Sequence, residues 1–388
     1  MWPHNPIKTV FILAPIVFSF ALALDTYMPV IPEMRQFFDT TPEMVQLTLS
    51  LFFLVTGFGQ LILGPLSDQF GRYKILLLSV SVFLVSSLLC ANAENITWMI
   101  IFRVLQGTGA CGMSVTAFAI VRDTFHGKQS AMIFSFLNGM ISISPILGPI
   151  IGILLTTIFP WHAVFYFLAI LAAIILLVVI VFVRESSNPK NRVKLNLSLV
   201  HRYCSICRSS TFWMYTMPAI AGVSAFFTLF SMTPYIIEAL NETRGKIGIF
   251  FGMAGASFLI GSVISGTIVH KIGVFKTTLY GTLLIFCSSL LLIAIYLING
   301  LSLWGFFGPS LLATFGCALT TGSGASGALE PFGKYPGTAA AMFGALELGG
   351  SAIIGSVATL ALINTPYPLA FTTLITSSLS FILLLCYK

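Results

Sequence analysis

The chain is a succession of long apolar stretches separated by short polar breaks. Most stretches are about 20 residues or longer, the length that an α-helix needs to cross the hydrocarbon core of a bilayer. They do not alternate between apolar and polar residues, so the pattern predicts helices and not the strands of a membrane barrel. We expect twelve membrane-spanning helices, at roughly 8–32, 43–66, 74–93, 97–121, 129–156, 161–183, 212–236, 246–270, 277–298, 302–326, 337–361 and 366–386.

The predicted helices divide into two sets of six. Residues 184–211 form the only long polar connection and are rich in Lys and Arg. We therefore predict an N-terminal bundle over 1–183, a cytoplasmic linker over 184–211 and a C-terminal bundle over 212–388. Two interpretations of the linker stay open. The segment from Leu195 to Cys207 could lie along the membrane surface as a basic amphipathic helix. Alternatively, the linker is a plain connection whose charge fixes the topology, which we favour.

A frame of three glycines and a lysine occurs twice, 202 residues apart, with intervals of 5, 7 and 3 residues in both copies. The first copy consists of Gly59, Gly64, Gly71 and Lys74. The second copy consists of Gly261, Gly266, Gly273 and Lys276. Related segments at equivalent places indicate two similar halves, which is an organisation found in secondary transporters. The expected fold is therefore an all-α membrane protein with two pseudo-symmetric six-helix bundles.

Composition and charge agree with a membrane protein. The chain is 57% apolar and 8% charged, whereas soluble domains are about a quarter charged. Its net charge is +7, and Lys and Arg concentrate on the side of the predicted helices that carries both chain ends. Arg35, Arg244 and Lys246 fall on the opposite side, and Arg103 lies within a span. This asymmetry places both termini in the cytoplasm, so the basic charge indicates topology and no nucleic-acid partner is expected.

The sequence lacks the groups of residues expected of a membrane enzyme, and neither an enzyme nor a signalling protein is the class we favour. No phosphate-binding glycine loop follows a strand, so we expect no nucleotide cofactor and an ion gradient as the energy source. The predicted spans hold no histidine pair and no cluster of acids. Cys204 and Cys207 lack a second pair that would complete four zinc ligands, so no metal site is expected.

The first glycine frame also carries charged residues. Gly64 and Gly71 permit close helix approach and a tight turn. Asp68, Arg72 and Asp123 fall at the cytoplasmic ends of the second to fourth predicted helices and could form a charge cluster. Such a cluster would hold a cytoplasmic gate closed and would break for inward opening. The alternative is a solvated turn whose charges only set topology, but the recurrence of the glycine spacing favours the gate.

Asp25, Arg103 and Glu347 are charged residues that lie well inside predicted spans, away from their ends. A charged residue costs about 2.5–3.5 kcal/mol at the centre of a spanning helix, so a functional role is the default explanation. Asp25 and Arg103 both lie about 10 Å below the outer surface when residues are counted at 1.5 Å each. Arg103 would favour the ionised carboxylate of Asp25 and an apolar cavity the neutral acid. That competition suits a proton site, and a structural salt bridge is the alternative.

Glu347 lies near the membrane midplane in the second half, ten residues after Gly337. It could balance a cationic substrate or serve as a second proton site. A carboxyl that only packs among Gly344, Gly349 and Gly350 is an equally open interpretation.

Two further groups complete the candidate site. Pro145, Gly148, Pro149 and Gly152 remove backbone donors and side-chain bulk from the fifth predicted helix, which predicts a kink and a surface for close helix approach. Aromatic side chains in the spans would make an apolar cavity for flat or amphiphilic ligands. The expected cavity residues are Tyr27, Gln106, Asn138, Phe226, Phe230 and Glu347.

Three of these segments resemble signatures of the major facilitator superfamily, in particular its twelve-span drug:proton antiporters. They are GPLSDQFGRYK at 64–74, RVLQGTG at 103–109 continuing to Arg122 and Asp123, and GMISISPILGPIIG at 139–152. Within that superfamily, DTYMPVIP at 25–32 and the segment from Glu330 to Gly337 resemble the bicyclomycin and chloramphenicol resistance subfamily.

The resemblance implies a proton-coupled antiporter that works by alternating access. It would export small amphiphilic compounds, either drugs or an endogenous metabolite such as a siderophore, across the bacterial inner membrane. A proton-coupled importer of a small nutrient on the same fold is the alternative. The expected partners are the small-molecule substrate, protons and membrane lipid, and we expect a monomer.

Overall fold

The computed structural model describes residues 5–186, 197–243, 245–333, 336–359 and 365–386. These residues form helices and no strand, which confirms the predicted all-α fold. Eleven helical segments among them are long and apolar enough to cross a membrane, and one bent pair of helices raises the number to twelve. The predicted spans therefore correspond to helices of the structure, apart from the residues at 360 and 361, which lie outside the described ranges.

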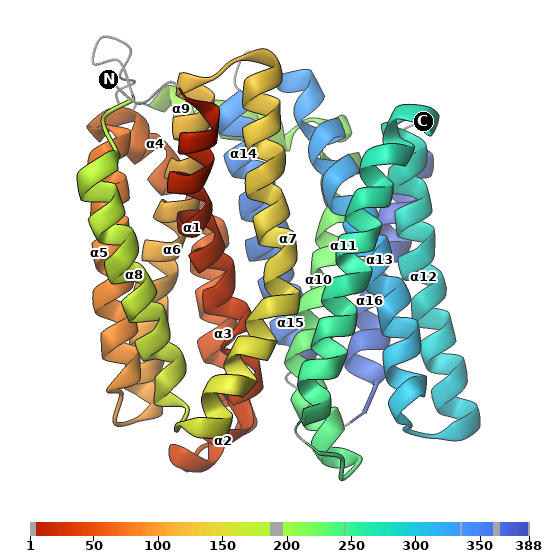
Figure 1. Cartoon of the computed structure of the whole chain (residues 1–388). Helices are drawn as coiled ribbons and strands as arrows, with labels where there is room; N and C mark the ends of the chain where they lie inside the picture. Colours follow the sequence, from red (N-terminus) through yellow and green to blue (C-terminus); the bar gives the residue numbers. More distant parts are fainter. Residues whose placement is uncertain (1–4, 187–196, 244, 334–335, 360–364, 387–388) are drawn as a thin grey trace. The chain divides into compact units, whose positions relative to one another are not determined.

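The contacts between helices divide the chain into two compact units, Met1–Leu199 and Val200–Lys388. The first contains α1 (Pro6–Asp25), η1 (Met28–Val30), α2 (Ile31–Phe37), α3 (Pro42–Phe58), α4 (Gln60–Phe70), α5 (Arg72–Ala91), α6 (Ile96–Thr124), α7 (Gly127–Ile158) and α8 (His162–Phe182). The second contains α10 (Ser210–Ala239), α11 (Gly245–Ile272), α12 (Val274–Asn299), α13 (Leu303–Leu329), η3 (Glu330–Phe332), α14 (Pro336–Gly344), η4 (Ala345–Gly350), α15 (Ser351–Thr359) and α16 (Tyr367–Cys386). Each unit is an antiparallel helical bundle, coloured red to yellow-green and green to blue in Figure 1.

The predicted linker contains a short helix, α9 (Leu197–Cys207), and the division between the two units falls within it. Residues 187–196 of the linker, and with them the predicted helix start at Leu195, lie outside the described residues. The indole Nε1 of Trp213 donates to the Cys207 carbonyl over 2.7 Å, which fixes the end of α9 to the start of α10.

Three predicted spans are interrupted helices. The first runs from α1 through the short η1 to α2, where Pro29 and Pro32 break the regular hydrogen bonding. The second is the pair α3 and α4, which bends by 46° at Gly59. A Cβ on Gly59 would lie 3.2 Å from Cys111 Sγ, so the bend also brings this segment close to α6. The eleventh contains the π-helical turn η4 between α14 and α15.

The two copies of the glycine frame adopt the same turn. Gly71 has a φ of 103° between α4 and α5, and Gly273 has a φ of 85° between α11 and α12. An L side chain rarely adopts such angles, whereas glycine does so without a steric penalty. A single glycine therefore suffices to end one helix and begin the next in each unit.

Apolar residues cover both faces of the outer helices, as expected for helices that contact lipid. On α8, Leu168, Ala172, Ile175 and Val179 are buried against the bundle. Ile170, Ile174, Leu177 and Val181 form an exposed stripe at helical spacing on the other face. In Figure 1, α8 runs alongside α5 in the first unit, and the two helices are joined by a hydrogen bond from Tyr166 to Asn92.

Candidate functional site

Asp25 is the last residue of α1, and its carboxylate faces α7. The hydroxyl of Ser144 donates to Asp25 Oδ2 over 2.6 Å, and both residues are buried. One turn further along α7, Gly148 contacts Asp25 so closely that an added Cβ would overlap the Cβ of Asp25. Gly152 approaches the carbonyl of Thr26 in the same way. The fifth-helix motif therefore presents a smooth face to the end of α1, with one hydroxyl aimed at the carboxylate.

The prolines of this motif do not divide the helix. Pro145 and Pro149 are buried inside α7, which runs as a single helix from Gly127 to Ile158. Their main effect is the loss of two backbone donors next to the glycines. Ser144 was absent from our predicted site, although its place just before Pro145 in the motif was a signal that could have been used.

Arg103 does not pair with Asp25, contrary to the expected competition between these two groups. Its Nη1 donates to the Ala23 carbonyl over 3.3 Å and to Gln106 Oε1 over 2.6 Å. Ala23 lies two residues before Asp25 on α1. Arg103 therefore bonds to the backbone of α1 close to Asp25 without pairing with the Asp25 carboxylate. Among the described residues, its Nε and Nη2 have no hydrogen-bond partner.

Aromatic rings enclose the Arg103 guanidinium, which is 0% exposed. Its Cζ lies 4.3 Å from the ring centroid of Tyr27 and 4.2 Å from that of Phe52, with Phe165 at 5.9 Å. Such cation–π contacts stabilise a cation that has been removed from water. Arg103 thus connects α1, α3, α6 and α8 in the interior of the first unit.

Tyr27 and Gln106, which we expected at a substrate cavity, are buried around this arginine in the structure. Gln106 is fully buried, accepts from Arg103, and donates from Nε2 to Ser87 Oγ over 2.8 Å. Tyr27 is also fully buried, and its hydroxyl is hydrogen-bonded to Thr48. A buried guanidinium requires hydrogen-bond acceptors in place of water. Gln106 supplies one, and Tyr27 supplies an aromatic face.

The charged hinge residues form a cluster within the first unit. Arg72 is buried at the start of α5, with its Nη2 paired to Asp68 and its Nε donating to Asp123 Oδ2 over 2.8 Å. Asp68 belongs to α4 and Asp123 to the last turn of α6, so one guanidinium joins three helices. Gly71 supplies the turn that places Arg72 there, and Gly64 faces Val115 of α6 at 3.8 Å from an added Cβ.

Two members of this cluster were missed by the sequence reasoning. Ser67 Oγ accepts a hydrogen bond from Arg72 Nη1. Glu185, just after α8, accepts from the backbone N–H of Arg72 over 2.9 Å and so caps the start of α5. Its position on the cytoplasmic side of the sixth predicted span was the available signal.

The second unit places Glu347 in the π-helical segment η4. Its side chain is half-buried, and no hydrogen bond or ion pair joins its carboxylate to another residue of the described ranges. The neighbouring Ser351 donates to the Ile220 carbonyl of α10 over 3.2 Å. Single π-turns recur at functional sites in other proteins, so Glu347 stays a candidate in both of its predicted roles.

The remaining predicted cavity residues differ in exposure. Phe230 is fully buried and is stacked between Phe226 at 4.3 Å and Phe251 at 4.4 Å, so it belongs to the core of the second unit. Phe226 is half-buried. Asn138 is exposed on α7, and its Nδ2 donates to the Phe134 carbonyl of the same helix over 2.9 Å.

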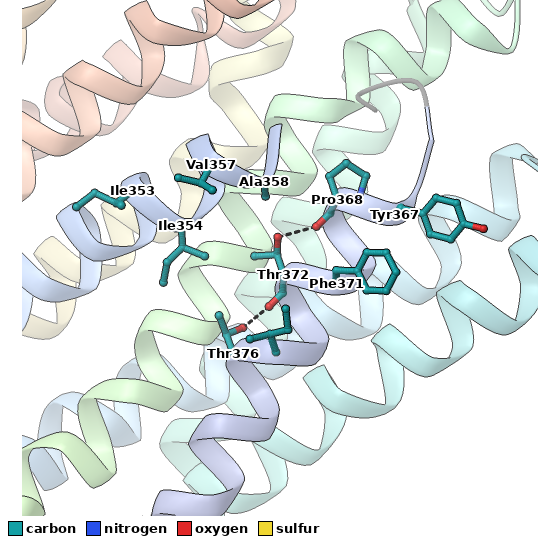
Figure 2. Close-up of a pocket in the computed structure, with 10 residues that line it drawn as sticks. Ile353, Ile354, Val357, Ala358, Tyr367, Pro368, Phe371, Thr372 and Thr376 are labelled. Atoms are coloured by element: carbon teal, nitrogen blue, oxygen red, sulfur yellow. Dashed lines mark hydrogen bonds between the residues drawn. The ribbon is translucent and has the colours of Figure 1, made fainter. Parts of the chain in front are cut away.

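An apolar groove of about 460 Å³ lies between α15 and α16. Figure 2 shows Ile353, Val357 and Phe371 along it, and its hydroxyls at Thr372 and Thr376 are hydrogen-bonded within α16. None of the predicted site residues lines this groove. Within the described chain, no group of three or more His, Cys, Asp or Glu residues could hold a metal ion.

The fold and its buried ionisable groups define a multi-pass membrane protein of the transporter class. A sequence profile of the Major Facilitator Superfamily matches residues 13–356, and the chain belongs to this family of transporters, which are not enzymes.

Several bacterial proteins are similar over most of the chain. A chloramphenicol resistance protein of Pseudomonas aeruginosa is 28% identical over 380 residues, covering 95% of this chain and 87% of its own length. A bicyclomycin resistance protein homolog of Haemophilus influenzae is 27% identical and covers 90% and 88%. The multidrug resistance protein MdtL of Salmonella heidelberg is 28% identical and covers 86% and 85%. The fold is similar to the crystal structure of the human organic anion transporter MFSD10 (TETRAN), with a TM-score of 0.68, 18% identity, and coverage of 99% of this chain and 100% of that one.

Proposed function

We propose that this protein is a proton-coupled antiporter that exports small amphiphilic compounds across the bacterial inner membrane by alternating access. The observation that carries the proposal is Asp25. Its carboxylate is buried in a membrane-spanning helix and pairs with no cation among the described residues. An ionisable group held at such a cost in a membrane span is best explained by ion transfer.

Antiport follows if proton and substrate compete for one site that opens alternately to the outside and to the inside. A proton taken up on the outer side neutralises Asp25, and its release on the inner side restores the charge. Each change alters the free energy of a buried carboxylate by an amount comparable with a conformational equilibrium of a few kcal/mol. The Arg72 cluster would hold the cytoplasmic end of the first unit together in the outward-facing state.

The relatives support a drug-like substrate class. Three similar bacterial proteins carry names that refer to resistance to chloramphenicol, bicyclomycin or several drugs. An identity near 28% supports the class of substrate and leaves the particular compound open, so drugs and an endogenous metabolite such as a siderophore are both included. Both termini in the cytoplasm and a monomeric transporter complete the proposal.

Export can be tested in a bacterial host that lacks its own drug exporters. We expect expression of the wild-type chain to lower accumulation of chloramphenicol or of a cationic amphiphilic dye, and to raise the inhibitory concentration. Asp25→Asn should abolish both effects at equal protein level in the membrane. Increased uptake of a small nutrient with no change for any of these compounds would contradict export and favour the importer.

A further inference from the structure

Ser144 differs from three other hydroxyl residues of α7 in the direction of its hydrogen bond. Ser142, Thr156 and Thr157 donate to carbonyls of α7 itself, the usual arrangement for Ser and Thr in membrane helices. Ser144 instead donates to another helix, to the carboxylate of Asp25 at 2.6 Å, and it is 0% exposed. Its hydroxyl therefore bonds to a side chain of α1 and not to the backbone of its own helix.

The helices α1 and α7 are in close contact around this bond. Gly148 lies directly against the Cβ of Asp25, and Gly152 lies against Thr26. With glycine at both places, α7 comes close enough for the short side chain of Ser144 to reach the carboxylate. Any larger residue at Gly148 would push the two helices apart and break the bond.

The charged and titratable groups on the helices that pack against α1 are directed elsewhere. On α6, Arg103 is bonded to Ala23 and Gln106. On α8, Tyr166 is bonded to Asn92 and His162 stacks on Trp161. The one charged side chain of α7, Lys128, lies 16 residues from Ser144, which is about 24 Å along the helix.

Ser144 thus makes the one side-chain hydrogen bond to Asp25 among the described residues. An O–H donor stabilises a charged carboxylate more than a neutral acid. When Asp25 gains a proton, this advantage disappears, and the Ser144 hydroxyl can return to a carbonyl one turn earlier on α7, as its neighbours do. The proton on Asp25 is in this way linked to the contact between α1 and α7.

We propose that Ser144 is a positioning residue that sets the pH at which Asp25 exchanges its proton, and that the α1–α7 contact transmits this change to the rest of the first unit. The inference rests on the proposed function, in which Asp25 is the proton carrier. It adds to that function a residue of α7 that is bonded to the proton carrier.

The test uses the purified full-length protein and dicyclohexylcarbodiimide, which modifies protonated carboxyls in apolar surroundings. Labelling of Asp25 is followed by mass spectrometry between pH 5 and 9, with Glu347 in the second unit as an internal reference. The variants are Ser144→Ala, Ser144→Thr, which keeps the hydroxyl, and the matched control Ser142→Ala.

In Ser144→Ala, we expect labelling of Asp25 to persist to a pH about one unit higher, the shift that loss of one hydrogen bond to a charged group produces. Ser142→Ala should match the wild type, and Ser144→Thr should lie closer to the wild type than Ser144→Ala does. Labelling of Glu347 should be unchanged in all variants. Folding of each variant is checked by its elution profile and its thermal midpoint.

If the pH at which labelling of Asp25 is half-maximal does not change in Ser144→Ala, the proposed role of Ser144 is wrong. The proposed function is tested separately, by the transport assay of Asp25→Asn. An equal shift in Ser142→Ala would also overturn the role of Ser144, because the effect would then be a general one of altering α7. If Asp25→Asn exports as well as the wild type, the proposed function fails and this inference fails with it, whatever the labelling shows.

Discussion

Arg72 Nε donates to Asp123 Oδ2 over 2.8 Å, and this bond ties the start of α5 to the last turn of α6. The same guanidinium pairs with Asp68 of α4, and Glu185 caps the backbone N–H of Arg72. Arg72 has a side-chain exposure of 5%, so these bonds are largely screened from water. A cluster of this kind is stable as a unit and is disrupted when any one partner leaves.

Removal of either side of this bond should weaken the closed gate. We expect Arg72→Ala and Asp123→Asn to insert normally and to reduce transport about tenfold or more, because each loses a charge-assisted bond worth about 1.5–3 kcal/mol. Transport is measured by accumulation of the exported compound in cells, at equal protein level in the membrane.

Arg122→Ala is the matched control for the gate. Arg122 lies next to Asp123 in sequence, but its side chain is 43% exposed and lies 3.9 Å from the Asp123 carboxylate. An exposed pair of this kind contributes little. Transport equal to wild type in Arg72→Ala, or a loss of equal size in Arg122→Ala, would be incompatible with a gate built on Arg72.

The two glycine turns should respond alike to a side chain. Gly71→Ala and Gly273→Ala place alanine at φ values of 103° and 85°, at a cost of roughly 1–2 kcal/mol each. Gly266→Ala is the control, because nothing lies within 4 Å of its added Cβ. Thermal unfolding of the detergent-purified variants measures the effect. A thermal midpoint for Gly71→Ala at or above that of Gly266→Ala would show that the turn does not need a glycine.

A side chain at Gly148 should separate α1 from α7. The Cβ of Gly148→Ala would overlap Asp25, so we expect a loss of about 1–3 kcal/mol in stability, as in other overpacked contacts. Gly139→Ala on the same helix meets nothing within 4 Å and should be neutral or slightly stabilising. The comparison is made by thermal unfolding, and equal midpoints for the two variants would mean that this contact is not tight.

Arg103 should behave as a structural residue and not as the switch partner of Asp25. Arg103→Ala leaves Gln106 without its donor and empties the space between Tyr27 and Phe52. We therefore expect the free energy of unfolding to fall by about 3–5 kcal/mol. Arg103→Lys should recover only part of this, since lysine lacks a planar group to stack. A stable, well-folded Arg103→Ala protein that had lost only its response to the pH gradient would restore the switch hypothesis.

The helices and the hinge were predictable from the sequence because their signals are local. Long apolar stretches predict membrane helices, and the glycine frame predicts a turn at Gly71, which the structure contains. The hinge charges could be brought together because sidedness places residues at the same end of their helices. Glu185 obeys the same rule and could have been included.

The direction in which a side chain points was not predictable from depth alone. Asp25 and Arg103 do lie at one level of the first unit, but Arg103 bonds to the Ala23 carbonyl of α1 while the Asp25 carboxylate accepts from Ser144. The rotation of each helix about its axis depends on packing, such as that of Gly148 against Asp25, and no count of residues from the membrane surface provides it. The same limit applies to Gln106 and Tyr27. Their positions along the chain did not show that their side chains contact Arg103.

The measurement that tests the central claim most directly is transport into liposomes with an imposed pH gradient. With the wild-type protein, a compound shown to be exported in cells should accumulate against its own gradient when a proton gradient is present. Asp25→Asn should still exchange that compound down its gradient and should not accumulate it, while Glu347→Gln shows whether the second unit contributes. Accumulation by Asp25→Asn at the wild-type level would contradict the account, because the proton would then be carried by a group other than Asp25.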